Sequence, residues 1–270
     1  MNFGFRRCAL ALITALATAW LPPAAAQAGS PKIGVVVMHG KGGSPARYVT
    51  KLALSLEEQG FLVANLEMPW SGRRNYDVDT ATAEKEIEAA LQAMRDKGAQ
   101  KLFVAGHSHG GIFAVYFGSR HAIDGVIAIA PGGNVASQAY RKEVAGSLEL
   151  ARKLVAEGKG GDKERFSDFE GSKGTYMVVS PAAAYLSWFD PDGAMNFVSS
   201  LRKMKASVPV LYVAPTGDYG GLRGVRMQMF NLLPKNPNTR MFEPDASHLE
   251  APTASIKEIA EWTTAVAKAP

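Results

Sequence analysis

The feature that most constrains the fold is the alternation of short apolar runs with amphipathic stretches. Ile33–Met38 is a continuous, valine-rich apolar run, which is typical of a strand buried on both faces of a parallel sheet. A helix is predicted over residues 45–59, where apolar side chains recur at helical spacing and Gly60 ends the pattern. The same order repeats along the chain, which predicts a parallel sheet with helices on both faces.

Five further apolar runs predict strands, over residues 61–66, 101–105, 124–130, 208–214 and 239–242. Three further amphipathic stretches predict helices, over residues 79–97, 109–120 and 253–267. The rhythm breaks at residues 134–206, which contain a predicted helix at about 137–157, a charged loop at 158–174 and an aromatic segment. Ligands bind such sheets beyond the carboxyl ends of the strands. Because the 134–206 insertion leaves from that edge, we expect it to form a cap over the site.

The first 28 residues have the pattern of a secretory signal peptide. Arg6 and Arg7 precede an apolar run from Cys8 to Leu21, which is shorter than the roughly 20 residues that span a bilayer. An Ala26-Gln27-Ala28 ending gives cleavage after Ala28 or Ala26. We therefore expect residues 29–270 to be exported, either to the periplasm or out of the cell, without stable membrane insertion.

Charge and cysteine content exclude several functional classes. The formal net charge is +5, and no Lys/Arg-rich run occurs beyond the N-terminal pair, so no nucleic-acid partner is predicted. The single cysteine excludes an internal disulfide and argues against a Cys-ligated zinc site.

Metal and nucleotide sites are not predicted either. His107 and His109 begin a zinc-hydrolase pattern that Gly111 and Ile112 then break. Gly40-Lys41 lacks the upstream glycine spacing and the Ser/Thr of a phosphate-binding loop. We expect no metal and no cofactor.

The motif that carries chemistry is Gly106-His107-Ser108-His109-Gly110, between a predicted strand and a predicted helix. This is the G-x-S-x-G nucleophile elbow in its required context. The turn is so tight that positions 106 and 110 must be small. It projects the Ser108 hydroxyl at a helix N-terminus, where the backbone N–H of His109 is available to an oxyanion.

A serine hydroxyl is a weak nucleophile until a base takes its proton, so an acid and a histidine should follow in that order. Asp218 follows the strand predicted at 208–214, and His248 follows the last predicted strand. These two residues and Ser108 are therefore predicted to form a catalytic triad. Three other aspartates are rivals for the acid: Asp190 and Asp192 in the insertion, and Asp245 beside His248.

Residues 31 to about 266 resemble an α/β-hydrolase-fold serine hydrolase of the esterase/lipase kind. The resemblance implies that the His39-Gly40-Lys41 loop supplies a second oxyanion donor, the backbone N–H of Lys41, beside that of His109. It also implies that His248 takes the Ser108 proton, that Asp218 orients the imidazole, and that water resolves the acyl-enzyme. The short N-terminal part leaves no room for two antiparallel strands, so we expect about six strands.

Four residues are assigned to substrate binding: His39, Trp70, Trp188 and Phe189. The aromatic side chains of the insertion, with Tyr185, Met195 and Phe197, would roof an apolar acyl pocket or form the cap's own core. Arg73 and Arg74 would recognise an acidic substrate group or lie on a solvated loop.

The sequence thus predicts a hydrolase that cleaves a carboxylic ester of a small-molecule acyl substrate. Thioester, lactone and amide bonds remain open, because they use the same acyl-enzyme chemistry. An acyltransferase and a non-catalytic binding protein with this fold are the alternatives from other classes.

Overall fold

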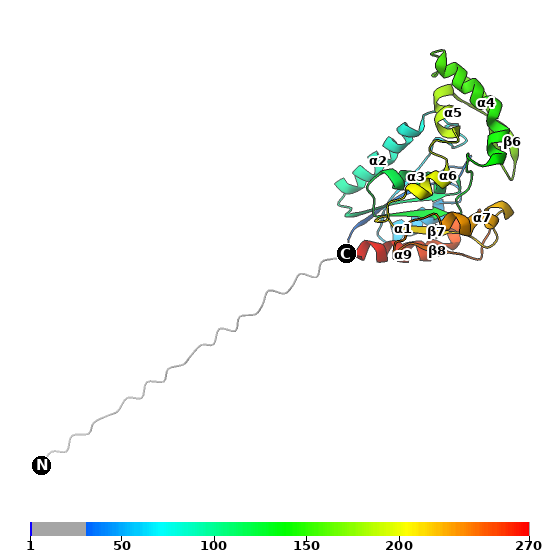
Figure 1. Cartoon of the computed structure of the whole chain (residues 1–270). Coiled ribbons are helices and arrows are strands. Elements are labelled where there is room, and N and C mark those ends of the chain that lie inside the picture. Colours follow the sequence, from blue (N-terminus) through cyan, green and yellow to red (C-terminus); the bar gives the residue numbers. More distant parts are fainter. Residues whose placement is uncertain (2–30, 270) are drawn as a thin grey trace.

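A six-stranded parallel sheet forms the centre of the protein (Figure 1). The computed structural model describes residue 1 and residues 31–269, so the predicted signal peptide lies, apart from Met1, outside the described residues. The strands, in their order across the sheet, are β2 (Leu62–Leu66), β1 (Ile33–Met38), β3 (Lys101–His107), β4 (Gly125–Ile129), β7 (Val210–Val213) and β8 (Arg240–Phe242). All five neighbouring pairs are parallel, so every strand ends at the same edge of the sheet.

Successive side chains of the central strands enter two different cores, as the period of a strand requires. Val36, Val104 and Val126 pack under α2 (Thr80–Asp96), α3 (His109–Arg120) and α6 (Phe197–Lys203). Their neighbours in sequence pack on the other face, against three helices: α1 (Thr50–Glu58), α8 (Ala251–Ala254) and α9 (Ile256–Lys268). The expectation of about six strands with helices on both faces is confirmed.

The chain between β4 and β7 holds a separate group of elements that stands above the sheet (Figure 1). We call residues 138–189 the cap; its elements are α4 (Gln138–Ala156), β5 (Lys163–Glu170), β6 (Gly174–Pro181) and α5 (Ala182–Phe189). β5 and β6 form an antiparallel hairpin, so the prediction of a charged loop over 158–174 is wrong. After the cap, α6 returns to pack on α3.

Several helices differ from the sequence prediction. The helix predicted from residue 45 begins only at Thr50, because the Pro45 carbonyl accepts side-chain hydrogen bonds from Thr50 and Asn65 and the chain turns at Tyr48, whose φ is 54°. Three helices were not predicted: α5, α6 and α7 (Gly220–Phe230), the last of which follows β7. The helix predicted at 253–267 is interrupted at Ser255, between α8 and α9. Of the helices in the described part of the chain, none has the length and apolar character needed to cross a membrane.

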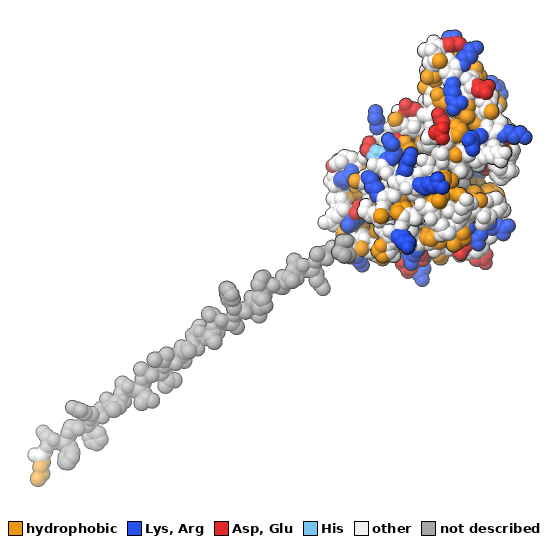
Figure 2. Space-filling model, in the orientation of Figure 1, with side chains coloured by type: hydrophobic (Ala, Val, Ile, Leu, Met, Phe, Trp, Pro, Cys, Tyr) orange, Lys and Arg blue, Asp and Glu red, His pale blue; other side chains and the backbone are white. Residues whose placement is uncertain are grey.

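Charged side chains lie interspersed over the face seen in Figure 2, with Lys and Arg scattered among acidic and apolar groups rather than gathered in one patch.

Candidate active site

Ser108 lies in a strained turn between β3 and α3, at the carboxyl edge of the sheet. Its φ is 55°, a left-handed conformation that costs a non-glycine residue energy and that persists where the surroundings impose it. A Cβ on Gly106 would lie 2.0 Å from the carbonyl oxygen of Gly110, and one on Gly110 would lie 2.7 Å from that of His39. Glycine is therefore required at both positions, as the elbow motif predicts.

Three side chains from three loops form one hydrogen-bonded chain. His248 Nε2 lies 3.0 Å from Ser108 Oγ, and His248 Nδ1 lies 2.7 Å from Asp218 Oδ1. With the Nδ1 proton donated to the carboxylate, Nε2 is the lone-pair nitrogen that accepts the Ser108 hydroxyl proton. His248 and Asp218 are both buried, so this chain lies in surroundings that strengthen its electrostatic interactions.

Asp218, rather than its rivals, is the carboxylate that reaches the imidazole. Its Oδ1 also accepts the backbone N–H of Tyr219 at 2.7 Å. An isolated parallel β-bridge between Gly217 and Ser247 joins the loop of Asp218 to the loop of His248. Asp245 instead accepts the Thr216 hydroxyl at 3.2 Å, and the Asp190 carboxylate accepts the backbone N–H of Asp192 at 3.0 Å.

The two histidines at the variable elbow positions are buried and neutral. Burial, followed by the neighbouring His248, lowers the pKa of His107 to about 3. Burial lowers the pKa of His109 well below its usual value, with a further contribution from Lys41. The His109 ring packs edge-on against Trp70 at 5.2 Å between centroids, so its side chain belongs to the core under the site.

The loop after β1 lies directly against the serine. A Cβ on Gly40 would be 3.2 Å from Ser108 Cβ, and Lys41 borders the same cavity as Ser108 and His109. The loop is held against the segment after β2, because the N–H of Gly42 donates to the Trp70 carbonyl at 2.9 Å. The backbone around Lys41 and the start of α3 thus flank Ser108, where the family resemblance implies two oxyanion donors.

A cavity of about 590 Å³ opens beside Ser108 and His248. Its apolar side chains come from the central fold, the cap and α7: Ile112, Pro131, Phe169, Phe197, Tyr212, Leu222, Val225 and Met229. The remainder is lined by glycines 132, 133, 171, 220 and 221 and by polar or charged residues that include Lys41, Asn134, Ser137, Glu170 and Ser172. The site therefore offers a mainly apolar surface next to the hydrogen-bonded Ser108 hydroxyl.

The four predicted substrate-binding residues are buried, and none of them lines this cavity. His39 holds the loop after β2, because its Nε2 accepts the N–H of Met68 at 3.0 Å. Trp70 donates to the His39 carbonyl at 2.8 Å, and Trp188 donates to the Val78 carbonyl at 2.7 Å. Phe189 stacks on Tyr185 within the cap. These positions support the alternative that the aromatic side chains form a core.

Arg73 and Arg74 are paired with carboxylates of their own loop and of α2. Arg73 binds Glu67, and Arg74 contacts both Asp77 and Glu86, at 3.0 and 2.7 Å. Neither residue borders the cavity at Ser108. Their contacts favour a structural role for this pair.

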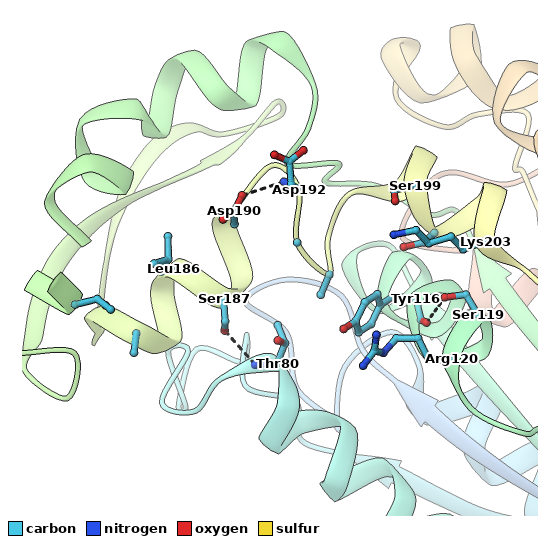
Figure 3. A pocket seen from close by; sticks show the side chains of 15 residues that line it. Thr80, Tyr116, Ser119, Arg120, Leu186, Ser187, Asp190, Asp192, Ser199 and Lys203 are labelled. Carbon is cyan, nitrogen blue, oxygen red and sulfur yellow. Dashed lines mark hydrogen bonds between the residues drawn. The ribbon is translucent and has the colours of Figure 1, made fainter. Parts of the chain in front are cut away.

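A second cavity, of about 510 Å³, lies between the cap and the helices α2, α3 and α6 (Figure 3). Its lining mixes Arg120 and Lys203 with Asp190 and Asp192, and it includes none of the three hydrogen-bonded residues at Ser108. Ser187 and Thr80 are joined across it by a hydrogen bond of 3.1 Å, which ties the cap to α2. Within residues 31–269, no cluster of three or more His, Cys, Asp or Glu side chains is placed to hold a metal ion.

Comparison with known proteins identifies the family. The sequence model of the serine aminopeptidase S33 family matches residues 29–169, just over half of the chain. The chain belongs to this α/β-hydrolase family. None of the curated proteins compared with it matches.

Solved structures share the fold of this S33 family member. A monoacylglycerol lipase of Paleococcus ferrophilus is 20% identical, with 86% of this chain and 94% of that chain covered and a TM-score of 0.59. A thermostable carboxyl esterase of Bacillus coagulans is 17% identical, with 87% and 89% covered and a TM-score of 0.57. Est1E of Butyrivibrio proteoclasticus, bound to ferulic acid, is 16% identical, with 87% and 88% covered and a TM-score of 0.55. At these identities the likeness establishes the α/β-hydrolase fold, which confirms the predicted fold class.

Two contributions to the site of this S33 family member were missed from the sequence. The first is α7, whose Leu222, Val225 and Met229 line the cavity and recur at helical spacing. That spacing was available as a signal, although three glycines within α7 weaken it. The second is Asp168, which contacts Lys41 at the border of the cavity; it is buried in the cap hairpin, where the sequence predicted a charged loop.

Proposed function

We propose that this protein is a serine hydrolase that cleaves a carboxylic ester through an acyl-enzyme on Ser108. The observation that carries the proposal is the hydrogen-bonded chain from Ser108 through His248 to Asp218 beside an apolar cavity. Membership of an α/β-hydrolase family supports it independently.

In the proposed reaction, Ser108 Oγ attacks the acyl carbonyl while His248 Nε2 takes its proton. Asp218 keeps the imidazole in the tautomer that leaves Nε2 free and stabilises the imidazolium that forms. The backbone N–H groups of Lys41 and His109 donate to the oxyanion, and each such donor is worth about 2.7–4 kcal/mol in comparable hydrolases. His248 returns the proton to the leaving alcohol, and water then attacks the acyl-enzyme with the same residue as base.

The apolar lining of the cavity favours an uncharged acyl group as its occupant. We propose a small-molecule substrate bound without metal or cofactor, because the proposed chemistry requires only an activated serine, a base and oxyanion donors. We also propose that residues 1–28 direct export, after which residues 29–270 act in the periplasm or outside the cell. The short apolar run and the alanine-rich ending support this proposal.

A fluorophosphonate probe tests the mechanism without knowledge of the substrate. The purified protein and its Ser108→Ala variant are treated with the probe, and mass spectrometry locates the adduct. We expect one adduct on Ser108 of the wild type and none on the variant, with both proteins equally folded by circular dichroism. A folded wild type without an adduct would instead favour a binding protein that has kept the fold.

Product analysis then identifies the bond and the acceptor. Ester, thioester, lactone and amide panels are compared at equal concentrations, and we expect turnover of esters to be fastest. Adding an acceptor alcohol distinguishes hydrolysis from acyl transfer, because a transferase would make a new ester rather than release the free acid.

A further inference from the structure

A single carboxylate, Asp168, joins the cap to the loop that lies against Ser108. Asp168 belongs to β5 and is completely buried. Besides Lys41, four groups donate hydrogen bonds to its two oxygens. Three are tyrosine hydroxyls, Tyr140 at 2.5 Å, Tyr76 at 3.0 Å and Tyr176 at 2.9 Å, and the fourth is the backbone N–H of Phe169 at 2.7 Å. Burial of a carboxylate is costly, and these donors offset part of that cost.

The cation that balances this charge is Lys41, the residue next to Gly40 in the loop against Ser108. Lys41 Nζ lies 2.6 Å from Asp168 Oδ1 and also donates to Tyr140 Oη at 2.8 Å and to the Phe169 carbonyl at 3.2 Å. Only 7% of the Lys41 side chain is exposed. The ammonium group is therefore fixed by three acceptors of the cap, while its own backbone belongs to the central fold.

The loop is held from two opposite sides as a result. On the side of the central fold, Gly42 N–H donates to the Trp70 carbonyl at 2.9 Å. On the side of the cap, the Lys41 side chain ends in the Asp168 cluster. A side chain anchored at its far end restricts the rotation of its own backbone, and a donor in an oxyanion hole must be fixed before the reaction to be effective.

We propose that Asp168 is a positioning residue, which acts through Lys41 to hold the Lys41 backbone N–H toward the oxyanion formed on Ser108. The inference rests on the proposed function, because it assigns to the cap a part in the same reaction. In this arrangement the oxyanion site is complete only when the cap hairpin packs on the central fold. The cap thus contributes to catalysis through a buried ion pair, in addition to lining the cavity.

The tyrosines in the cluster cannot replace Asp168 as the partner of Lys41. Burial and the neighbouring carboxylate raise the pKa of Tyr76, Tyr140 and Tyr176, so all three remain neutral donors to Asp168. A phenol keeps its proton in this environment and cannot balance a buried ammonium. Without the carboxylate, the Lys41 side chain gains by leaving the cluster toward water, and its backbone is then free to turn.

The test compares Asp168→Asn with Ser187→Ala. Asparagine has the size of aspartate but no charge. Ser187 contributes a different contact between the cap and the central fold, the hydrogen bond to Thr80 at 3.1 Å (Figure 3). Ser187 does not line the cavity at Ser108. The first readout is the second-order rate constant for labelling of Ser108 by a fluorophosphonate, whose phosphoryl oxygen occupies the oxyanion site. The second readout is the division between kcat and KM for p-nitrophenyl butyrate, used as a general ester probe.

We expect Asp168→Asn to slow labelling by roughly 10²-fold and to lower kcat by a similar factor with KM within about twofold, because the lost donor acts in the transition state. Ser187→Ala should label at the wild-type rate. If Asp168→Asn also labels at the wild-type rate, the inference is wrong while the serine mechanism stands. If the wild type itself is not labelled, the proposed function fails first.

The double variant Lys41→Met/Asp168→Asn keeps the test decisive where Asp168→Asn does not fold, because it leaves no buried charge without a partner. A positioning role predicts that thermal stability returns toward the wild type while the labelling rate stays low. A purely structural role predicts that stability and labelling return together, which would overturn the inference.

Discussion

The ring of His107 lies against the loop of His248, with its Nε2 2.9 Å from the His248 carbonyl oxygen. The two rings are 5.0 Å apart between centroids. Because the pKa of His107 is lowered to about 3, its ring is neutral at ordinary pH, and Nε2 is the nitrogen that donates to the carbonyl. A residue that the motif leaves variable thus fixes the backbone that carries the proposed base.

Replacement of His107 by leucine should lower both stability and activity. The change leaves a buried carbonyl without a donor, which costs about 1–3 kcal/mol in the free energy of unfolding. His107→Gln retains an N–H donor and serves as the matched control. We expect the leucine variant to lose more stability in urea and more kcat than the glutamine variant, and equal losses in both would contradict the hydrogen bond.

The low pKa of His107 also predicts how stability depends on pH. Between pH 3 and 6.5 the unfolded chain binds a proton at this histidine and the folded protein does not, so the free energy of unfolding falls as pH falls. One such group contributes a slope of up to about 1.4 kcal/mol per pH unit. Urea unfolding at pH 6, 5 and 4 should give a shallower slope for His107→Gln than for the wild type. Identical slopes would show that His107 is protonated in the folded protein.

Exchange of Asp218 for asparagine should abolish most turnover without unfolding the protein. The amide favours the wrong imidazole tautomer, and in a comparable triad this change lowers kcat by about 10⁴-fold. Asp245→Asn is the matched control, because Asp245 lies on the same loop as His248 but contacts Thr216 instead. Hydrolysis of p-nitrophenyl butyrate by the two purified variants checks the assignment, and a large loss in the control alone would reverse it.

The elements around Ser108 were predictable because each local signal agreed with the fold. The apolar run of β3 ends at the elbow, and the predicted helix at 109–120 is the helix observed. Ser108, Asp218 and His248 each follow a predicted strand, and they occur in the order that the elbow motif requires. Strand ends converge in a parallel sheet, so topology alone brought the three together.

The helix predicted at about 137–157 is α4, but the cap hairpin and most of the cavity lining were not predictable, for physical reasons that particular residues illustrate. In β5, Phe166 and Asp168 alternate as buried residues, but an aspartate at a buried position hides the period of a strand. Trp70 and Trp188 are aromatic residues near the site, and their direction depends on hydrogen-bond acceptors from distant segments. Tertiary packing, rather than propensity, decides such cases.

A glycine-to-alanine change should have opposite effects at Gly110 of the elbow and at Gly146 of α4. Gly110→Ala would place a Cβ 2.7 Å from the His39 carbonyl and 2.8 Å from that of Met38, two backbone atoms that cannot move separately from β1. We expect no folded protein, or one with a large loss of stability. Gly146 lies exposed in α4 with open space around it, so Gly146→Ala should stabilise the protein by about 0.5–1 kcal/mol. Thermal melts of both variants check the pair, and a Gly110→Ala protein as stable as the wild type would show that the elbow is looser than its contacts indicate.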